Sequence, residues 1–176
     1  MLRSTRISRG MCMIGLCCAL VGFTIHCGVS HAEEKRMPIG VSVQRNIRVV
    51  YQIKYDHWKG GIGEGLYYLQ NLVAAYDSLA IDEVDRSIHA VFHGSAGYWI
   101  LTDKSYNKFK NTKTGNPNGD IIEELVERSV NVELCAQTMK IKRWSNEDIM
   151  PGMKIVIGAY PRVIELQMQG YAYIRF

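Results

Sequence analysis

Short apolar blocks alternate with blocks of mixed apolar and polar residues along most of the chain. The apolar blocks are rich in β-branched and aromatic residues and end at turn residues, which is typical of strands. They cover 46–55, 86–94, 130–135, 153–159 and 171–176. The mixed blocks between them have the spacing of helices with one buried face. They cover 62–79, 97–110, 120–129, 136–144 and 161–170.

This order of elements predicts the fold. Strands that alternate with helices favour a mainly parallel sheet, because parallel neighbours need a crossover connection and a helix supplies it. We therefore expect a single α/β domain over 46–176, with about five strands and with helices on both faces of the sheet. A polar arm over 33–45, which contains Pro38 and Gly40, precedes this domain.

The first 32 residues have the pattern of an export signal. Three arginines without an acidic residue precede the apolar run 11–25, and Ser30 and Ala32 are small residues three and one positions before a cleavage point. This pattern predicts a signal peptide over 1–32 and a periplasmic or secreted protein with no membrane attachment after cleavage. The apolar run is short for a membrane span, so an uncleaved anchor is the less favoured alternative.

Removal of this segment changes both the charge and the cysteine content. Of the 21 basic residues, three lie in 1–32, which leaves 18 basic against 17 acidic residues. A nearly neutral domain lacks the basic surface of a nucleic-acid-binding protein, so no nucleic-acid partner is expected. Four of the five cysteines also lie in 1–32, and Cys135 remains. A single cysteine in an exported domain suggests an intermolecular bond or a free thiol.

Cys135 ends the third predicted strand and precedes a predicted helix. Amide groups at a helix start favour a thiolate over a thiol, and an accessible thiolate is able to attack a disulfide or carry sulfur as a persulfide. The alternative is a buried cysteine that packs as a small apolar residue. Without a second cysteine in the domain, an intramolecular dithiol cycle is excluded. A carrier thiol remains open.

The sequence places two further candidate features after strands, where parallel sheets usually form binding sites. His93 and Gly94 follow the second strand, and a histidine there can hydrogen-bond to or protonate a bound species, or be a satisfied structural residue. The glycine-rich loop that contains Gly61 and Gly63 follows the first strand. This loop lacks the phosphate-binding spacing, so a tight turn and close packing are favoured over nucleotide binding. Widely separated histidines predict no metal site.

Two other groups of residues each have two interpretations. The basic segment 140–144 is either a solvated helix end or a surface that attracts anionic sulfur species. The aromatic residues Tyr98, Trp99 and Tyr106 form either a subunit interface or part of the core.

Several of these segments together resemble the DsrE/DsrF-like family. The resemblance rests on "CAQTM" with Cys135 and Thr138, on "FHG" at the earlier strand end, on "YYLQNLVAAY" with Asn71, and on the terminal "LQMQGYAYIRF". It covers nearly all of 46–176 and is closest to a branch of that family with a similar "GYAYI" ending.

The resemblance implies a compact α/β domain that assembles into trimers or hexamers. It also implies that Cys135 takes the place of a cysteine that carries persulfide between donor and acceptor proteins. Thr138 and Asn71 match family positions near that site. Since the studied relays work in the cytoplasm, an exported chain is not expected to thiolate tRNA.

We therefore expect an exported sulfur carrier or sulfurtransferase-like relay. Cys135 acts as the carrier thiol, His93 borders its pocket, and no cofactor is required. Gly61, Gly63, Gly94, Thr138 and Asn71 complete the expected site. The alternative is a non-catalytic oligomeric binding or assembly module in which the cysteine is buried.

Overall fold

The computed structural model describes residues 38–176. The predicted signal peptide therefore lies outside the described residues, as does the first part of the predicted arm. Residues 38–45 are exposed and contain no helix or strand. Residues 40–176 pack as one unit, which contains every helix and strand described below.

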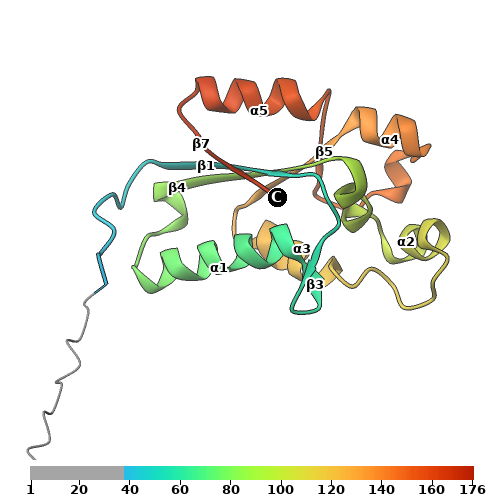
Figure 1. Ribbon diagram of the computed structural model, residues 1–176, viewed down its shortest axis with the longest axis horizontal. Helices are drawn as coiled ribbons and strands as arrows, with labels where there is room; N and C mark the ends of the chain where they lie inside the picture. Colours follow the sequence, from blue (N-terminus) through green and yellow to red (C-terminus); the bar gives the residue numbers. More distant parts are fainter. Residues whose placement is uncertain (1–37) are drawn as a thin grey trace, which may run out of the picture. The chain divides into compact units, whose positions relative to one another are not determined.

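Five parallel strands form the central sheet (Figure 1). They are β1 (Ile47–Ile53), β4 (Arg86–Phe92), β5 (Asn131–Cys135), β6 (Lys154–Val156) and β7 (Ala172–Arg175). Their order across the sheet is β6-β5-β4-β1-β7, and every neighbouring pair is parallel. The predicted single α/β domain with about five mainly parallel strands is confirmed.

Helices cover both faces of this sheet. In Figure 1, α1 (Glu64–Ser78) and α3 (Gly119–Glu127) lie on one face and α5 (Ala159–Met168) lies on the other. The chain moves in one direction across the sheet from β1 to β6 and then returns past β1 to β7. Right-handed crossovers put the helix of a returning connection on the opposite face, which explains the place of α5.

The alternation of side chains along each strand divides the core into two parts. Val49, Tyr51 and Ile53 of β1 join the large cluster beneath α1 and α3. Val50 of the same strand belongs to a smaller cluster beneath α5, which also contains Cys135. The cysteine side chain is therefore directed to the α5 face of the sheet.

The predicted helix over 97–110 is wrong as a single element. The segment contains a 3₁₀ helix, η2 (Gly94–Ile100), and then a separate helix, α2 (Asp103–Lys110). Thr102 interrupts the two because its backbone is extended and its side chain accepts a hydrogen bond from the amide of Ser105. This N-cap arrangement starts α2 anew.

The remaining elements are short. β2 (Trp58–Lys59) and β3 (Ile62–Gly63) form an antiparallel hairpin before α1. Two 3₁₀ helices, η1 (Glu83–Asp85) and η3 (Asn146–Asp148), lie in connections, and α4 (Ala136–Lys142) directly follows β5. Within residues 38–176, no helix is both long enough and apolar enough to cross a membrane.

Candidate functional site

Cys135 and His93 lie side by side at the carboxyl ends of neighbouring strands. Phe92 of β4 is in register with Leu134 of β5, so His93 and Cys135 are the next residues of the two chains. Parallel neighbours are about 4.8 Å apart, and both side chains follow the alternation onto the α5 face. The two residues that the sequence marked as reactive thus lie in one place.

Both side chains line a pocket of about 490 Å³. Three segments form its walls: His93 and Gly94 after β4, Cys135 with the first turns of α4, and the connection from β6 to the start of α5. The residues that line it from α4, from the connection after β6 and from the start of α5 are Gln137, Thr138, Ile141, Ile157, Gly158, Ala159, Tyr160 and Pro161. This volume lies in the range of small-molecule sites.

His93 is buried and held by a defined partner. Its Nε2 lies 2.8 Å from Nε2 of Gln52 on β1, and the hydroxyl of Tyr173 on β7 donates to the amide oxygen of that Gln52. Burial, with lesser contributions from the positive charges of Lys54 and Arg175, lowers the pKa of His93 to about 4. The imidazole is therefore neutral at neutral pH.

These bonds fix the proton of the neutral ring. Because the amide oxygen of Gln52 accepts from Tyr173, its NH₂ group faces the histidine and donates to Nε2. The ring proton then lies on Nδ1, which has no hydrogen-bond partner within residues 38–176. His93 is thus suited to donate a hydrogen bond in the pocket rather than to act as a strong acid or base.

Gly94 and Thr138 close the wall between the two strand ends. The amide of Gly94 donates to the hydroxyl oxygen of Thr138 over 3.2 Å, which leaves the threonine proton free to be donated. Gly94 has a φ of +61°, and a Cβ there would lie 2.9 Å from the carbonyl oxygen of Lys54. The glycine is required both by its backbone conformation and by this close approach.

The first turn of α5 forms the other side of the pocket. Gly158 is its N-cap, and the ring of Tyr160 packs edge-on against His93 at 5.4 Å between centroids. Helix amides at a first turn carry partial positive charge and favour an anion such as a thiolate. Cys135 itself is 5% exposed, so reagents reach it only through this pocket or through local opening.

Three of the expected site residues lie elsewhere, which corrects the predicted pocket. Gly61 is an exposed turn residue with a φ of +86°, and Gly63 packs against the ring of Trp99 and donates to Asn118. Asn71 is exposed on α1. α1 covers the face of the sheet opposite α5, so none of the three borders the cysteine pocket. The expectation that the glycines serve a turn and close packing is confirmed.

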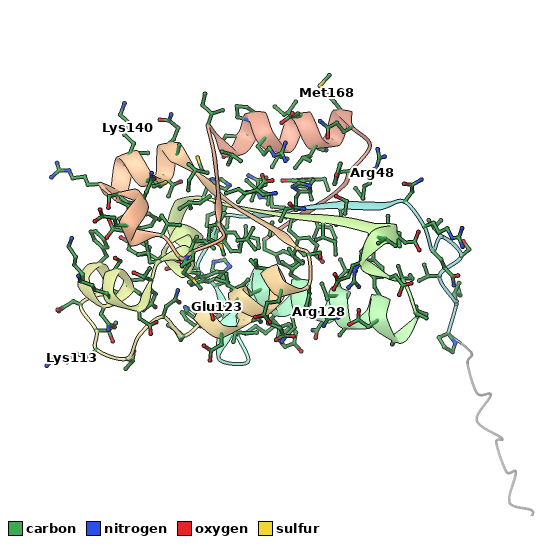
Figure 2. All side chains as sticks on the ribbon, turned by 180° about the vertical axis from the view of Figure 1, so that it is seen from behind. Arg48, Lys113, Glu123, Arg128, Lys140 and Met168 are labelled. Atoms are coloured by element: carbon green, nitrogen blue, oxygen red, sulfur yellow. The ribbon has the colours of Figure 1, made fainter. Side chains whose placement is uncertain are left out.

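The basic segment after Cys135 contributes an apolar residue to the pocket and no charge. Ile141 lines the pocket, whereas Lys140 points away from the fold (Figure 2). Of the aromatic candidates, Trp99 and Tyr106 are buried and Tyr98 packs on the same cluster. Core packing is the correct interpretation for Trp99 and Tyr106, whereas Tyr98 is only partly buried.

A second polar group lies beneath α5, farther from the strand ends. Glu133 of β5 accepts hydrogen bonds from Arg162 of α5 and lies 2.6 Å from Nδ1 of His89 on β4. Burial alone would raise the pKa of Glu133, but the bonds from His89 and Arg162 outweigh it and lower this pKa below the ordinary value. These contacts join α5 to the sheet that supports the pocket.

Sequence reasoning missed Gln52, Tyr173 and Tyr160. Gln52 and Glu133 each interrupt an otherwise apolar strand, and a polar residue at a buried strand position is a signal for a buried hydrogen-bonding partner. Tyr173 and Tyr160 had no such signal, because only the fold brings them to the site. In the described part of the chain, no cluster of three or more His, Cys, Asp or Glu residues is arranged to hold a metal ion.

The comparisons with known proteins agree with this architecture. A protein of unknown function, MTH1491 from Methanobacterium thermoautotrophicum, is 20% identical, with a TM-score of 0.51 over 74% of this chain and 99% of its own. The ychN protein from E. coli is 16% identical, with a TM-score of 0.52 over 74% of this chain and 100% of its own. At such identities the likeness concerns the fold alone. A comparison with curated proteins finds no match.

The family model for the DsrE/DsrF-like family matches residues 66–176, which is more than half of the chain and includes both strand ends of the pocket. The resemblance noted in the sequence is confirmed by this match. The chain belongs to the DsrE/DsrF-like family.

Proposed function

We propose that this protein is an exported persulfide carrier that uses Cys135 as its only carrier thiol. Membership of the DsrE/DsrF-like family indicates a sulfur-relay-related role. The observation that carries the proposal is the pocket that Cys135 lines together with His93 and Thr138, two side chains with a proton to donate, on Nδ1 and on the hydroxyl respectively.

The proposed transfer is a thiolate displacement at sulfur. The Cys135 thiolate attacks the outer sulfur of a persulfide R–S–SH, the donor S–S bond breaks, and R–S⁻ leaves with the electron pair. The product is Cys135–S–SH, and no external oxidant or reductant takes part. His93 and Thr138 donate hydrogen bonds to the negative charge as it moves from one sulfur to the other. A thiol of an acceptor protein then takes the outer sulfur by the same chemistry.

Intact mass spectrometry tests this proposal directly. Folded protein that has been exposed to a persulfide donor is expected to gain the mass of one sulfur atom, about 32 Da, and to lose it with reductant. Cys135→Ser is expected to gain nothing. If the folded wild-type protein takes up no sulfur while the urea-unfolded protein does, the carrier function is rejected.

A binding or assembly module is the second candidate. It is favoured by the burial of Cys135 among Val50, Val91 and Val163, because free cysteines often serve as small apolar core residues. A small alkylating reagent separates the two functions. The carrier requires modification of folded protein without global unfolding, whereas the module requires protection of the thiol until the protein unfolds.

Export and self-association complete the proposal. Sequencing of the mature N-terminus tests export, since cleavage after Ala32 leaves Glu33 as the first residue. We propose a trimer or hexamer in which a second copy of the chain packs on the outer side of α5. Ile164 and Met168 support this arrangement, since both are exposed, and Figure 2 shows Met168 pointing away from the fold. Ile164 and Met168 lie one and two helical turns after Tyr160, so the three side chains share one face of α5.

A further inference from the structure

The pocket beside Cys135 is uncharged. Among its eleven lining residues, all within the described part of the chain, none is Asp, Glu, Lys or Arg. The imidazole of His93, which also lines the pocket, is neutral at neutral pH because burial lowers its pKa to about 4. Lys54 and Arg175, whose positive charges help to lower the pKa of His93, lie outside this lining. A charge that a ligand brings into the pocket therefore has hydrogen bonds and the first turn of α5 as its direct partners.

The mouth of the pocket is also apolar. Ile141 and Ile157 are 77% and 81% exposed, and Tyr160 beside them is 58% exposed. All three line the pocket. Exposed apolar side chains gathered at the opening of a concave site are typical of a surface that binds an apolar group.

We infer that this pocket takes an organic persulfide with an apolar substituent, of the alkyl or aralkyl class, in preference to inorganic sulfur anions such as thiosulfate or polysulfide. This inference rests on the proposed function, because it names the donor for the same thiol. The apolar substituent packs against Ile141, Ile157 and Tyr160, and the outer sulfur reaches Cys135.

The charge of the reacting groups decides the preference. The reaction of a neutral R–S–SH with the Cys135 thiolate places one negative charge in the pocket throughout, first on the cysteine and then on the leaving R–S⁻. The Nδ1–H of His93, the hydroxyl of Thr138 and the start of α5 suit one such charge. A thiosulfate dianion would bring two further charges, and burial of charge without a cationic partner is strongly unfavourable.

Thiosulfonate reagents test this selectivity without any sulfur transfer. Benzyl methanethiosulfonate is neutral and apolar, and 2-sulfonatoethyl methanethiosulfonate is anionic, while both modify a thiolate by the same reaction. The selectivity is the rate of the benzyl reagent at Cys135 divided by the rate of the anionic reagent. On folded protein this ratio is expected to exceed the ratio on urea-unfolded protein by about tenfold or more. An equal ratio in the two states, a faster anionic reagent, or no reaction of the folded protein with either reagent would overturn the inference.

A charge-insertion variant sharpens the test. Ile157→Lys places a cation at the mouth, at a side chain that is already exposed, and is expected to reduce the selectivity about fivefold or more by favouring the anion. The matched control is Val84→Lys, because Val84 is 92% exposed and lies in η1, outside the pocket. The control is expected to keep the wild-type ratio. If Ile157→Lys leaves the ratio unchanged, Ile157 does not lie at the opening through which the reagents reach Cys135.

A second experiment separates the inference from the carrier function. Sulfur loading of Cys135 is compared for benzyl persulfide, thiosulfate and inorganic polysulfide at equal concentration, with intact mass as the readout. Loading by all three at similar rates refutes the apolar preference and leaves the carrier function standing. Loading by none, together with the thiosulfonate selectivity, refutes the carrier function and retains an apolar ligand pocket. Preferential loading by benzyl persulfide supports both.

Discussion

The Nε2 atom of Gln52 on β1 lies 2.8 Å from the Nε2 atom of His93, which follows β4 and lines the cysteine pocket. The hydroxyl of Tyr173 donates to the other end of the same glutamine. Three strands, β7, β1 and β4, thus contribute one chain of hydrogen bonds that ends at the histidine. Tyr173 donates to Gln52 and Gln52 donates to His93, and this order of donors and acceptors determines which nitrogen of His93 carries the proton.

We predict that Gln52→Glu reverses this tautomer. An ionised carboxylate only accepts hydrogen bonds, so Nε2 must then carry the proton, and the negative charge raises the pKa of His93. Nitrogen-15 correlation spectra of the imidazole are expected to show Nδ1–H in the wild type and Nε2–H in the variant. Tyr173→Phe is expected to give a mixture, because the glutamine amide is then free to turn over. A wild-type spectrum with Nε2–H would refute the assignment.

The lowered pKa of His93 predicts a pH-dependent stability. The folded value is about 4 against an ordinary 6.5, so the unfolded chain binds the proton more readily between these values. The contribution of the neutral ring is complete above pH 6.5 and is lost as the pH falls towards 4. Urea unfolding is expected to show a loss of up to about 3 kcal/mol over this window.

His93→Gln isolates this effect. Its unfolding free energy is expected to decline less steeply than that of the wild type between pH 6.5 and pH 4. From pH 7 to pH 8 the difference between the two proteins should stay constant, which serves as the internal control. Equal slopes in the acidic window would show that folding does not lower the pKa of His93.

Glu133 is predicted to be important for stability. Its side chain is 1% exposed, and removal in Glu133→Ala leaves Arg162 and His89 without their buried acceptor. Breaking a buried pair in this way costs about 3–5 kcal/mol. Glu165→Ala is the matched control, because Glu165 bonds the same arginine but at an exposed position, where about 1 kcal/mol or less is expected. Similar losses in the two variants would contradict a buried role.

The close approach at Gly63 gives a steric prediction. A Cβ at this position would lie 2.4 Å from the ring of Trp99, which is fully buried and unable to move aside. Gly63→Ala is expected to lower the unfolding free energy by about 2–4 kcal/mol. In contrast, Gly119→Ala meets nothing within 4 Å and lies in α3, so it is expected to be neutral or stabilising by about 1 kcal/mol. Thermal unfolding of the two variants tests this contrast.

The proposed assembly predicts a change in oligomeric state. Ile164→Glu puts a charge on the outer side of α5, where the wild-type side chain is exposed in the monomer, so the fold should be retained. Light scattering after size exclusion is expected to show an oligomer for the wild type and a monomer for this variant. Val84→Glu is the charge control, because Val84 is exposed in η1 and lies outside α5. A monomeric wild-type protein would refute self-association.

The sequence by itself determined the order and type of the elements and the place of the reactive residues along the chain. Apolar blocks that alternate with helical blocks leave few arrangements besides a parallel sheet, and the carboxyl ends of parallel strands share one edge. Because that rule needs only the order of the elements, it brings His93 and Cys135 to the same edge. The same rule also placed the loop of Gly61 and Gly63 at that edge. The order of the elements alone does not show on which face of the sheet this loop lies.

Only the tertiary structure decided which face each residue occupies and what surrounds the thiol. The return of the chain from β6 to β7 places α5, and with it Tyr160 and Ile157, over Cys135 while α1 takes Asn71 to the opposite side. Gln52 and Tyr173 are 121 residues apart in the chain and meet only across β1 and β7. Such contacts depend on strand order, and local sequence patterns do not encode strand order because it arises from long-range packing.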